Sequence, residues 1–457
     1  MKKQIYFLFF LFTFTSTLSA QKEKWTSLFD GKTLKGWNQK NGKAIFKVEN
    51  GEIIGVTVSN TTNSFLCTNE DYGDFILELE LKVDESMNSG IQFRSESKPD
   101  YKNGQVFGYQ MEVDPSPRAW SGGINDEGRR EWLYIPNINP EGKKAFITNG
   151  WNKYRIEAIG NTMRTWINGV PVAHLIDDMT PKGFIALQVH AIYGDMKEGM
   201  KIHWKNIRLM QLSDGRDGMH RVSTPLDNIP VVNLLQNNLS DQEKAQGFKL
   251  LFNGKDFTGW RGVHQDKMPD KRWNVIAGNM VISPSDGTET GNDIVTTEQY
   301  SAFELVFDFK LTEGANSGVK YFVNEDFDSG GKSGIGLEFQ ILDDEHHPDA
   351  KLGVVGNRTL GSLYDLIPSY KPEKRFQKKI GEWNQGRIVS LPNNIIQHWL
   401  NSFKVVEYER KSNIFDALVA RSKYEKYKGF GAGDKGQILL QDHGNSVSFK
   451  NIKIRRL

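Results

Sequence analysis

The chain contains two copies of one domain, and this duplication limits its fold more than any other feature. The segment LFDGKTLKGW at residues 28–37 returns as LFNGKDFTGW at residues 251–260, and NSGIQFRSE at 88–96 returns as NSGVKYFVNE at 316–325. Four more pairs follow in the same order: GYQMEV with GLEFQI, WNKYRIEAI with WNQGRIVSL, GFIALQVH with GQILLQDH, and WKNIRL with FKNIKI. Because the period is about half of the chain, the protein is a tandem pair of domains and not a solenoid.

Each copy has the sequence pattern of β-strands. From Phe75 to Val83 every second residue is apolar and the residues between are mostly charged, and the same alternation runs from Phe303 to Leu311. A period of two residues is typical of a strand with one face in a core. Asn-Gly, Asp-Gly and Gly-Gly pairs separate such runs, as expected for tight turns. Many short antiparallel strands in each copy predict an all-β protein built from two-sheet sandwiches.

The repeats set the domain limits. We expect a first domain over residues 21–210, a linker over 211–246 and a second domain over 247–457. In the linker, SDQE at Ser240 has the spacing of a capping box and predicts a short helix from Asp241 to Gln246, ended by Gly247. Apolar residues at 231–235 should dock this linker on a domain, which would make the tandem semi-rigid.

Residues 1–20 have the pattern of a secretory signal. Lys2 and Lys3 precede an apolar run from Ile5 to Phe14, and Ser19-Ala20 supplies a small-residue cleavage site. The run is too short to span a bilayer, so no transmembrane segment is expected in the mature chain. Cys67 is the only cysteine, so no internal disulfide can form. Export without disulfides predicts a bacterial periplasmic or cell-surface protein.

The net charge of the chain argues against nucleic acid as a partner. The formal net charge is +2, and removal of Lys2 and Lys3 with the signal would bring it to 0. A neutral chain lacks the electrostatic footprint that nucleic-acid binding requires. We therefore expect no nucleic-acid partner.

The segment at residues 336–365, GLEFQILDDEHHPDAKLGVVGNRTLGSLYD, is the densest in groups that can do chemistry. It opens as a strand in which apolar residues alternate with Glu338 and Gln340, so that a carboxylate and an amide share one face. An acidic, histidine-containing turn and a glycine-rich loop follow. A rigid strand leading into a polar loop is typical of functional sites, although a solvated amphipathic strand would have the same pattern.

These motifs resemble a known family. LFNGKDFTGW, NSGVKYF, GLEFQILDDEHHPDAKLG, GNRTLGSLYDL, QDHG and FKNIKI are similar to the 3-keto-disaccharide hydrolase family of concanavalin-like jelly rolls. The first copy matches through LFDGKTLKGW, NSGIQFRSE and GYQMEVDPSPRAWSGGINDEGRREWL, so the resemblance covers nearly all of both domains. It implies two tandem jelly-roll β-sandwiches. It also implies hydrolysis of glycosides whose sugar ring carries a ketone at C3.

The implied chemistry needs three groups. A C3 ketone acidifies the C2 proton, so a base can remove it, the enolate can expel the C1 substituent, and water can then add. The protein must supply the base, a group that holds the enolate oxygen, and a proton donor for the leaving group. Glu338 could be the base, Arg358 could hold the oxygen, and His346 could exchange protons. The catalytic candidates are Glu338, His346, Asp343, Arg358, Tyr364, Asp365 and His443.

A second set of polar and aromatic residues could bind substrate. The first copy exchanges the acid and the amide, with Gln110 and Glu112 where the second has Glu338 and Gln340. The tryptophans of its glycine-rich loop could stack on a sugar ring. The substrate-binding candidates are Gln340, Gln110, Glu112, Arg118, Trp120, Asp126, Arg130, Trp132 and His190.

Alternatives remain open from the sequence. The DDEHHPD run would also suit a divalent cation, although its spacing matches no zinc pattern. A lectin-like binding protein would share the sandwich. A conventional two-carboxylate glucanase would need a pair such as Glu112 and Asp114, but the second copy has Leu342 in place of Asp114. We favour the second copy for catalysis.

Overall fold

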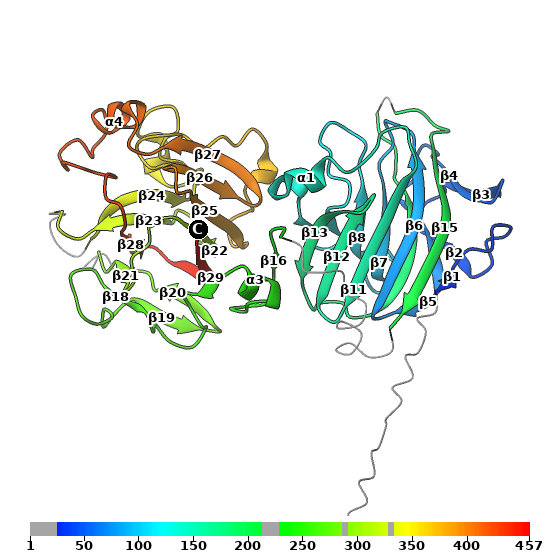
Figure 1. Ribbon diagram of the computed structural model, residues 1–457, viewed down its shortest axis with the longest axis horizontal. Coiled ribbons are helices and arrows are strands. Elements are labelled where there is room, and N and C mark those ends of the chain that lie inside the picture. The colour runs from blue at the N-terminus through cyan, green and yellow to red at the C-terminus, as the bar shows by residue number, and fades with distance from the viewer. Residues whose placement is uncertain (1–24, 195, 213–227, 286–290, 328–332) are drawn as a thin grey trace, which may run out of the picture.

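The computed structural model describes residues 25–194, 196–212, 228–285, 291–327 and 333–457. Over these residues the chain forms two β-sandwiches that lie side by side, joined through β16 and α3 (Figure 1). The expected signal at residues 1–20 lies outside the described residues. The all-β, two-sandwich fold class predicted from the sequence is confirmed.

The first sandwich packs a large sheet against a smaller one, with one hydrophobic core between them. The large sheet contains, in spatial order, β16 (Val232–Asn233), β13 (Val170–Ile176), β12 (Thr162–Ile167), β11 (Asn152–Ile159), β6 (Phe75–Val83), β15 (Lys201–Gln211), β4 (Glu52–Val56) and β3 (Ile45–Glu49), while β1 (Thr26–Ser27) pairs with β15. The smaller sheet contains β10 (Glu131–Tyr134), β9 (Ile124–Glu127), β8 (Val106–Val113), β7 (Ser89–Ser97), β14 (Gly183–Val189), β5 (Ser64–Tyr72) and β2 (Trp37–Lys40).

The second sandwich repeats this plan. Its large sheet contains β19 (Trp273–Ile276), β20 (Asn279–Ile282), β29 (Val447–Arg456), β22 (Phe303–Leu311), β25 (Asn384–Ser390), β26 (Ile395–Leu400) and β27 (Phe403–Glu409), while β17 (Lys249–Leu250) pairs with β29. Its smaller sheet contains β18 (Trp260–Gly262), β21 (Ile294–Thr296), β28 (Gln437–Leu440), β23 (Asn316–Asn324) and β24 (Ile335–Leu342). This order matches β2-β5-β14-β7-β8 of the first copy strand for strand.

The two copies differ beyond the last matching strand of the smaller sheet. In the first copy β9 and β10 extend the sheet past β8. In the second copy a loop takes that place, and its Leu363 forms an isolated antiparallel bridge with Phe339 of β24. The helical elements are short: α1 (Pro140–Lys143), α3 (Asp241–Ala245), α4 (Asn413–Val419) and the 3-10 turns Pro136–Ile138, Pro348–Lys351 and Lys374–Phe376. In the described part of the chain, no helix is long and apolar enough to cross a membrane.

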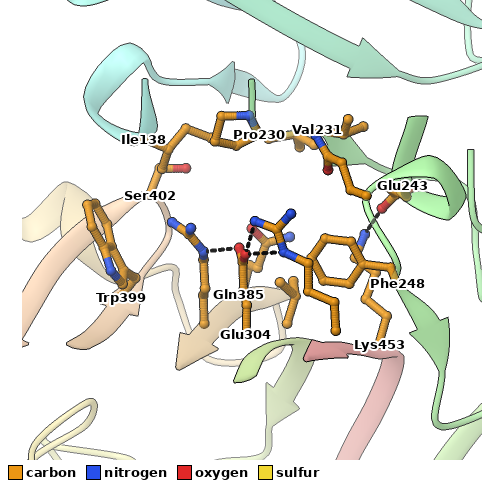
Figure 2. A pocket seen from close by; sticks show the side chains of 15 residues that line it. Ile138, Pro230, Val231, Glu243, Phe248, Glu304, Gln385, Trp399, Ser402 and Lys453 are labelled. Atoms are coloured by element: carbon orange, nitrogen blue, oxygen red, sulfur yellow. Dashed lines mark hydrogen bonds and ion pairs between the residues drawn. The ribbon is translucent and has the colours of Figure 1, made fainter. Parts of the chain in front are cut away.

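The linker is fixed to both domains. The predicted capping box is present, because the Ser240 hydroxyl accepts from the Glu243 amide and the Glu243 carboxylate accepts from the Ser240 amide. On one side β16 pairs in parallel with β13, and Val232 joins the core of the first sandwich. On the other side Glu243 forms a buried ion pair with Lys453 of β29 (Figure 2). The predicted docking of the linker is confirmed.

The boundary between the domains is closely packed. Figure 2 shows Ile138 and the linker residues Pro230 and Val231 facing Trp399 and Ser402 of the second sandwich across a narrow gap. Beneath the gap Glu304 accepts a hydrogen bond at 2.6 Å from Arg387 and another at 2.8 Å from Arg455, so its charge is balanced within the second domain.

Candidate functional site

The outer face of the smaller sheet of the second copy carries the strongest cluster of reactive groups. In β24 the apolar residues 337, 339 and 341 are fully buried in the core, while Glu338 and Gln340 point to the opposite face. The register sets Glu338 opposite Lys320 of β23 and Gln340 opposite Gly318. The predicted alternation of β24 is therefore confirmed, and it places an acid, an amine and an amide on one surface.

Glu338 has an unusual environment for a carboxylate. Its side chain extends over Gly318, where a Cβ atom would stand 2.3 Å from Oε1. The residue is 4% exposed, yet within the described residues its carboxylate receives no hydrogen bond and forms no ion pair. Buried carboxylates are normally paired or hydrogen-bonded. Glu338 is thus a nearly enclosed carboxylate without a hydrogen-bond donor among the described residues.

A pocket of about 270 Å³ lies next to Lys320, the cross-strand partner of Glu338. It is lined by Lys320, Ile335, Gly336, Lys423, Tyr424, Lys426 and Tyr427. Lys320 donates to the Gly334 carbonyl at 3.1 Å and lies 3.9 Å from the buried Asp293 carboxylate. Lys423 is exposed at the mouth, with Nζ 4.1 Å from the centre of the Tyr364 ring. The pocket therefore presents ammonium groups, and one of them belongs to the cross-strand neighbour of Glu338.

The glycine-rich loop after β24 is held by a chain of polar contacts. The Tyr364 hydroxyl donates to Asp349 at 2.8 Å, and Arg358 donates to Asp349 at 2.9 Å and to Asp365 at 2.8 Å. Asp365 also accepts from the backbone amide of Lys423 at 2.9 Å. Burial, followed by the bond to Asp349, raises the pKa of Tyr364 far above its usual range. Arg358 is thus engaged by two carboxylates, and its first role is to shape the loop.

The two adjacent histidines lie in different settings. His346 donates to Asp343 at 2.8 Å, and that bond raises the pKa of His346. Asp343 also accepts from the Gly314 amide at 2.8 Å, so the pair closes the turn at the end of β24. The ring of His347 instead lies 6.2 Å from that of His443. Burial, and then His443, lowers the pKa of His347, and its Nδ1 accepts a hydrogen bond from the Asp349 amide at 3.2 Å.

The residues that suggested a divalent cation are the histidines and carboxylates of the DDEHHPD run. Among the side chains that the structure describes, no group of three or more His, Cys, Asp or Glu residues is arranged to hold a metal ion. Asp343 and Asp349 are occupied by hydrogen bonds within the loop.

In the first copy the equivalent face carries a carboxylate that is held by donors. Glu112 accepts from Asn88 at 2.6 Å, from Gln110 at 3.1 Å and from Arg118 at 3.4 Å. Burial, the largest influence, raises the pKa of Glu112 to about 7. His190 follows β14 on this side of the domain, and burial lowers its pKa. Asp114 is bound by Arg118 at 2.7 Å, so Glu112 and Asp114 share one arginine and are not a free carboxylate pair.

Two other candidates of the first copy lie on the opposite face of the sheet. Asp126 is paired in register with Tyr109, whose ring is in the core, whereas Gln110 is paired with Asn125. Asp126 is fully buried between Arg129 and Arg130. The structure therefore does not bring Asp126 and Arg130 together with Gln110 and Glu112.

Trp120 and Trp132 form a pair at the domain boundary. Their ring centres lie 4.7 Å apart in an edge arrangement. Trp120 is 2% exposed and packs against Phe403 and Arg375 of the second domain. Its ring is therefore enclosed by protein and not open to a sugar, while Trp132 remains half-buried beside it. The glycine-rich loop suggested a ligand platform, and only the folded tandem shows that this loop builds an interface.

The sequence reasoning missed Lys320, Lys423 and Tyr424. Lys320 replaces Gln92 of the first copy in an otherwise matching motif, and this difference was the available signal. Lys423 and Tyr424 lie in a loop after α4, nearly sixty positions from Asp365. No local pattern connects that loop with β24.

Comparison with known proteins agrees with the repeated architecture. The model of the 3-keto-alpha-glucoside-1,2-lyase-like domain matches residues 24–210 and again residues 247–455. The chain is 34% identical over 236 residues to the 3-keto-disaccharide hydrolase of Bacteroides thetaiotaomicron, a match that covers 47% of this chain and 79% of that protein.

Two solved structures are also similar. Both are putative glycosyl hydrolases of Parabacteroides distasonis. One is 32% identical, with a TM-score of 0.43, and the match covers 49% of this chain and 99% of that one. The other is 28% identical, with a TM-score of 0.34, and the match covers 46% of this chain and 99% of that one. The family model spans most of the chain in two adjacent matches, so this protein belongs to the 3-keto-alpha-glucoside-1,2-lyase-like domain family and contains that domain twice.

Proposed function

We propose that this protein hydrolyses 3-keto-glycosides, including 3-keto-disaccharides, and that the second copy carries the reaction. The observation that carries this proposal is the Glu338 carboxylate, which is 4% exposed, has no donor among the described residues and lies opposite Lys320, a residue that lines a pocket together with Lys423. The family and its hydrolase relative support the same class of reaction.

The proposed reaction proceeds by elimination and hydration. Glu338 removes the C2 proton, the electron pair of that bond forms the C1–C2 double bond, and the C1–oxygen bond breaks. The leaving oxygen takes up one proton. Water then adds its hydroxyl to C1 and a proton to C2, which yields the free 3-keto sugar and the released alcohol. A carboxylate is a suitable base because the neighbouring ketone makes the C2 proton acidic.

Other groups near this face can stabilise the negative charge that develops during the reaction. Negative charge moves to the C3 oxygen when C2 loses its proton, and a cation placed there lowers the barrier. Lys423 is better suited than Arg358 to stabilise this charge, because Arg358 is already paired with the carboxylates of Asp349 and Asp365. His347, with its lowered pKa, lies near His443 and could pass a proton to or from the leaving group.

A chromogenic assay tests the proposal. Release of 4-nitrophenol should be seen from 4-nitrophenyl 3-keto-glucoside and not from 4-nitrophenyl glucoside. Turnover of the unoxidised compound would instead indicate a conventional glycosidase. Binding of sugars without turnover of either compound would indicate a lectin-like protein. The same assay in the presence of a chelator tests the divalent-cation expectation.

We also propose export to the periplasm or cell surface. The support is the charged start, apolar run and small-residue site of residues 1–20. Cell fractionation with amino-terminal sequencing tests it, and a cytoplasmic chain that retains residues 1–20 would contradict it.

A further inference from the structure

The outer face of the first copy contains a buried amide without partners. Gln188 of β14 is 0% exposed, and in the part of the chain that the structure describes neither Oε1 nor Nε2 has a hydrogen-bond partner. A buried polar group that makes no hydrogen bond loses its bonds to water without replacing them, which destabilises the folded state. Such groups are rare in folded proteins and each calls for an explanation.

The strand register shows which groups share the surface with Gln188. Leu187 pairs with Ile91, so the next residues, Gln188 and Gly90, are opposite each other, and Gly90 pairs in turn with Glu112. Glu112, Gly90 and Gln188 therefore form one row across three neighbouring strands. The space that a side chain at Gly90 would need is filled by Gln110, whose Cδ would lie 2.3 Å from a Cβ atom at residue 90.

A second row lies alongside the first. It contains Asn125 of β9, Gln110 of β8 and Gln92 of β7. Gln92 donates to Gln110 at 2.6 Å, whereas the buried Oδ1 of Asn125 has no partner among the described residues. The face thus combines the Glu112 carboxylate with several neutral amides, two of which have unmet hydrogen-bonding capacity among the described residues. Amides and carboxylates in this arrangement suit the alternating donors and acceptors of sugar hydroxyls.

An exposed aromatic ring stands at the edge of the same face. β14 leads directly into His190 and then Tyr193, which is 68% exposed and whose ring centre lies 6.3 Å from that of His190. The second copy has Ser446 at the position of Tyr193. An exposed tyrosine beside a polar surface offers the apolar face on which a sugar ring can stack.

We propose that the outer face of the first copy is a second carbohydrate site, in which a neutral, unoxidised sugar displaces the Gln110 side chain from above Gly90 and binds through Gln188, Asn125 and Glu112, with Tyr193 as the stacking surface. The site is for recognition and not for turnover. Its carboxylate is held by Asn88, Gln110 and Arg118, whereas Glu338 of the second copy has no such donors among the described residues. The first copy would therefore hold glycan near the catalytic copy, to which it is joined through the docked linker.

Calorimetric titration of the full chain with trehalose, sucrose and cellobiose tests this proposal. We expect at least one sugar to bind with a Kd of about 1 mM or tighter. Gln188→Leu and Tyr193→Ala should each weaken that binding at least about tenfold, the effect of losing about 1.4 kcal/mol. Gln441→Leu, at the position of the second copy that matches Gln188, is the control and should bind like the wild type.

The outcomes separate this site from the catalytic one. Gln188→Leu removes an amide that makes no hydrogen bonds among the described residues, so the melting temperature of this variant should not fall. A loss of sugar binding in this variant would then not be explained by unfolding. Binding lost in Glu338→Gln but kept in Gln188→Leu would place the sugar in the second copy and overturn the proposal. Absence of binding by all three sugars would overturn it as well. Neither result would depend on whether 3-keto-glycosides are turned over.

Discussion

Glu338 and Gly318 are in direct contact across β23 and β24, because the Glu338 side chain occupies the space that a side chain at residue 318 would need. A Cβ atom at Gly318 would lie 2.3 Å from Oε1 of Glu338 and 3.0 Å from its Cδ. Both distances are shorter than van der Waals contact allows. The position of the proposed base therefore depends on the absence of a single methyl group on the neighbouring strand.

Gly318→Ala should move the carboxylate and lower activity without unfolding the domain. A displacement of about 1 Å can cost a catalytic group on the order of a hundredfold in rate, so we expect kcat to fall at least about tenfold. Gly433→Ala is the control, because its Cβ would meet its nearest neighbour at an ordinary 3.5 Å. Steady-state kinetics and melting curves check both. Equal activity in the two variants would show that the Glu338 position is not critical.

Glu338→Gln should remove the base while keeping the shape of the side chain. General-base catalysis contributes about 10² to 10⁴ in rate, so kcat for a 3-keto-glycoside should fall within that range. Since the Glu338 carboxylate has no donor to lose among the described residues, the variant should melt at or above the wild-type temperature. Activity near wild type would move the catalytic base elsewhere, with the first copy as the next place to search.

Lys423→Met should reduce turnover more than substrate binding. The lysine lies at the pocket mouth over Tyr364, where it could stabilise charge that exists only after the C2 proton has left. Loss of one such group costs about 10²- to 10³-fold in kcat. Lys428→Met is the matched control, since this exposed lysine does not line the pocket. A change in KM alone would assign Lys423 to binding.

The first copy should become less stable as pH rises, because of Glu112. Burial raises the pKa of Glu112 to about 7 from an ordinary 4.5. Between these values the folded state keeps a proton that the unfolded state releases, so the free energy of unfolding falls as pH increases. The full effect is on the order of 3 kcal/mol. Urea titrations between pH 4.5 and 8 should show a steeper decline for the wild type than for Glu112→Gln. Parallel curves would mean that Glu112 titrates normally.

Trp120→Ala should loosen the tandem. The ring is 2% exposed and packs on Phe403 of the other domain, and truncation of a buried tryptophan costs about 3–5 kcal/mol. We expect the single variants Trp120→Ala and Phe403→Ala to be non-additive in a double-mutant cycle measured by denaturation. Additive effects would show that the two rings do not stabilise each other.

Much of the fold follows from the sequence because strands and duplication leave regular signals. The alternation in residues 75–83 and 303–311 corresponds to β6 and β22, and the capping box at Ser240 corresponds to α3. These features depend on neighbours within a few positions. The packing of Trp120 against the second domain could not be found in this way, because it joins residues almost 300 positions apart.

The candidate site was predictable in part for the same reason. The strand pattern placed Glu338 and Gln340 on one face, and the loop supplied Arg358, Tyr364 and Asp365 together. What the pattern could not show is which partners each side chain meets. His346 is bound to Asp343, His347 lies near His443, and Lys423 reaches the pocket from the loop after α4.

The most direct test of the central claim is the isotope content at C2 of the released sugar. Hydrolysis of a 3-keto-glycoside by the wild-type protein in D₂O, followed by mass spectrometry at short times, should give a product with deuterium at C2, because the C2 proton leaves and a solvent deuteron returns. Substrate incubated with Glu338→Gln measures the exchange that occurs without the base. A wild-type product that keeps hydrogen at C2 would show that the C1–oxygen bond breaks without C2 deprotonation, and would contradict the proposed mechanism.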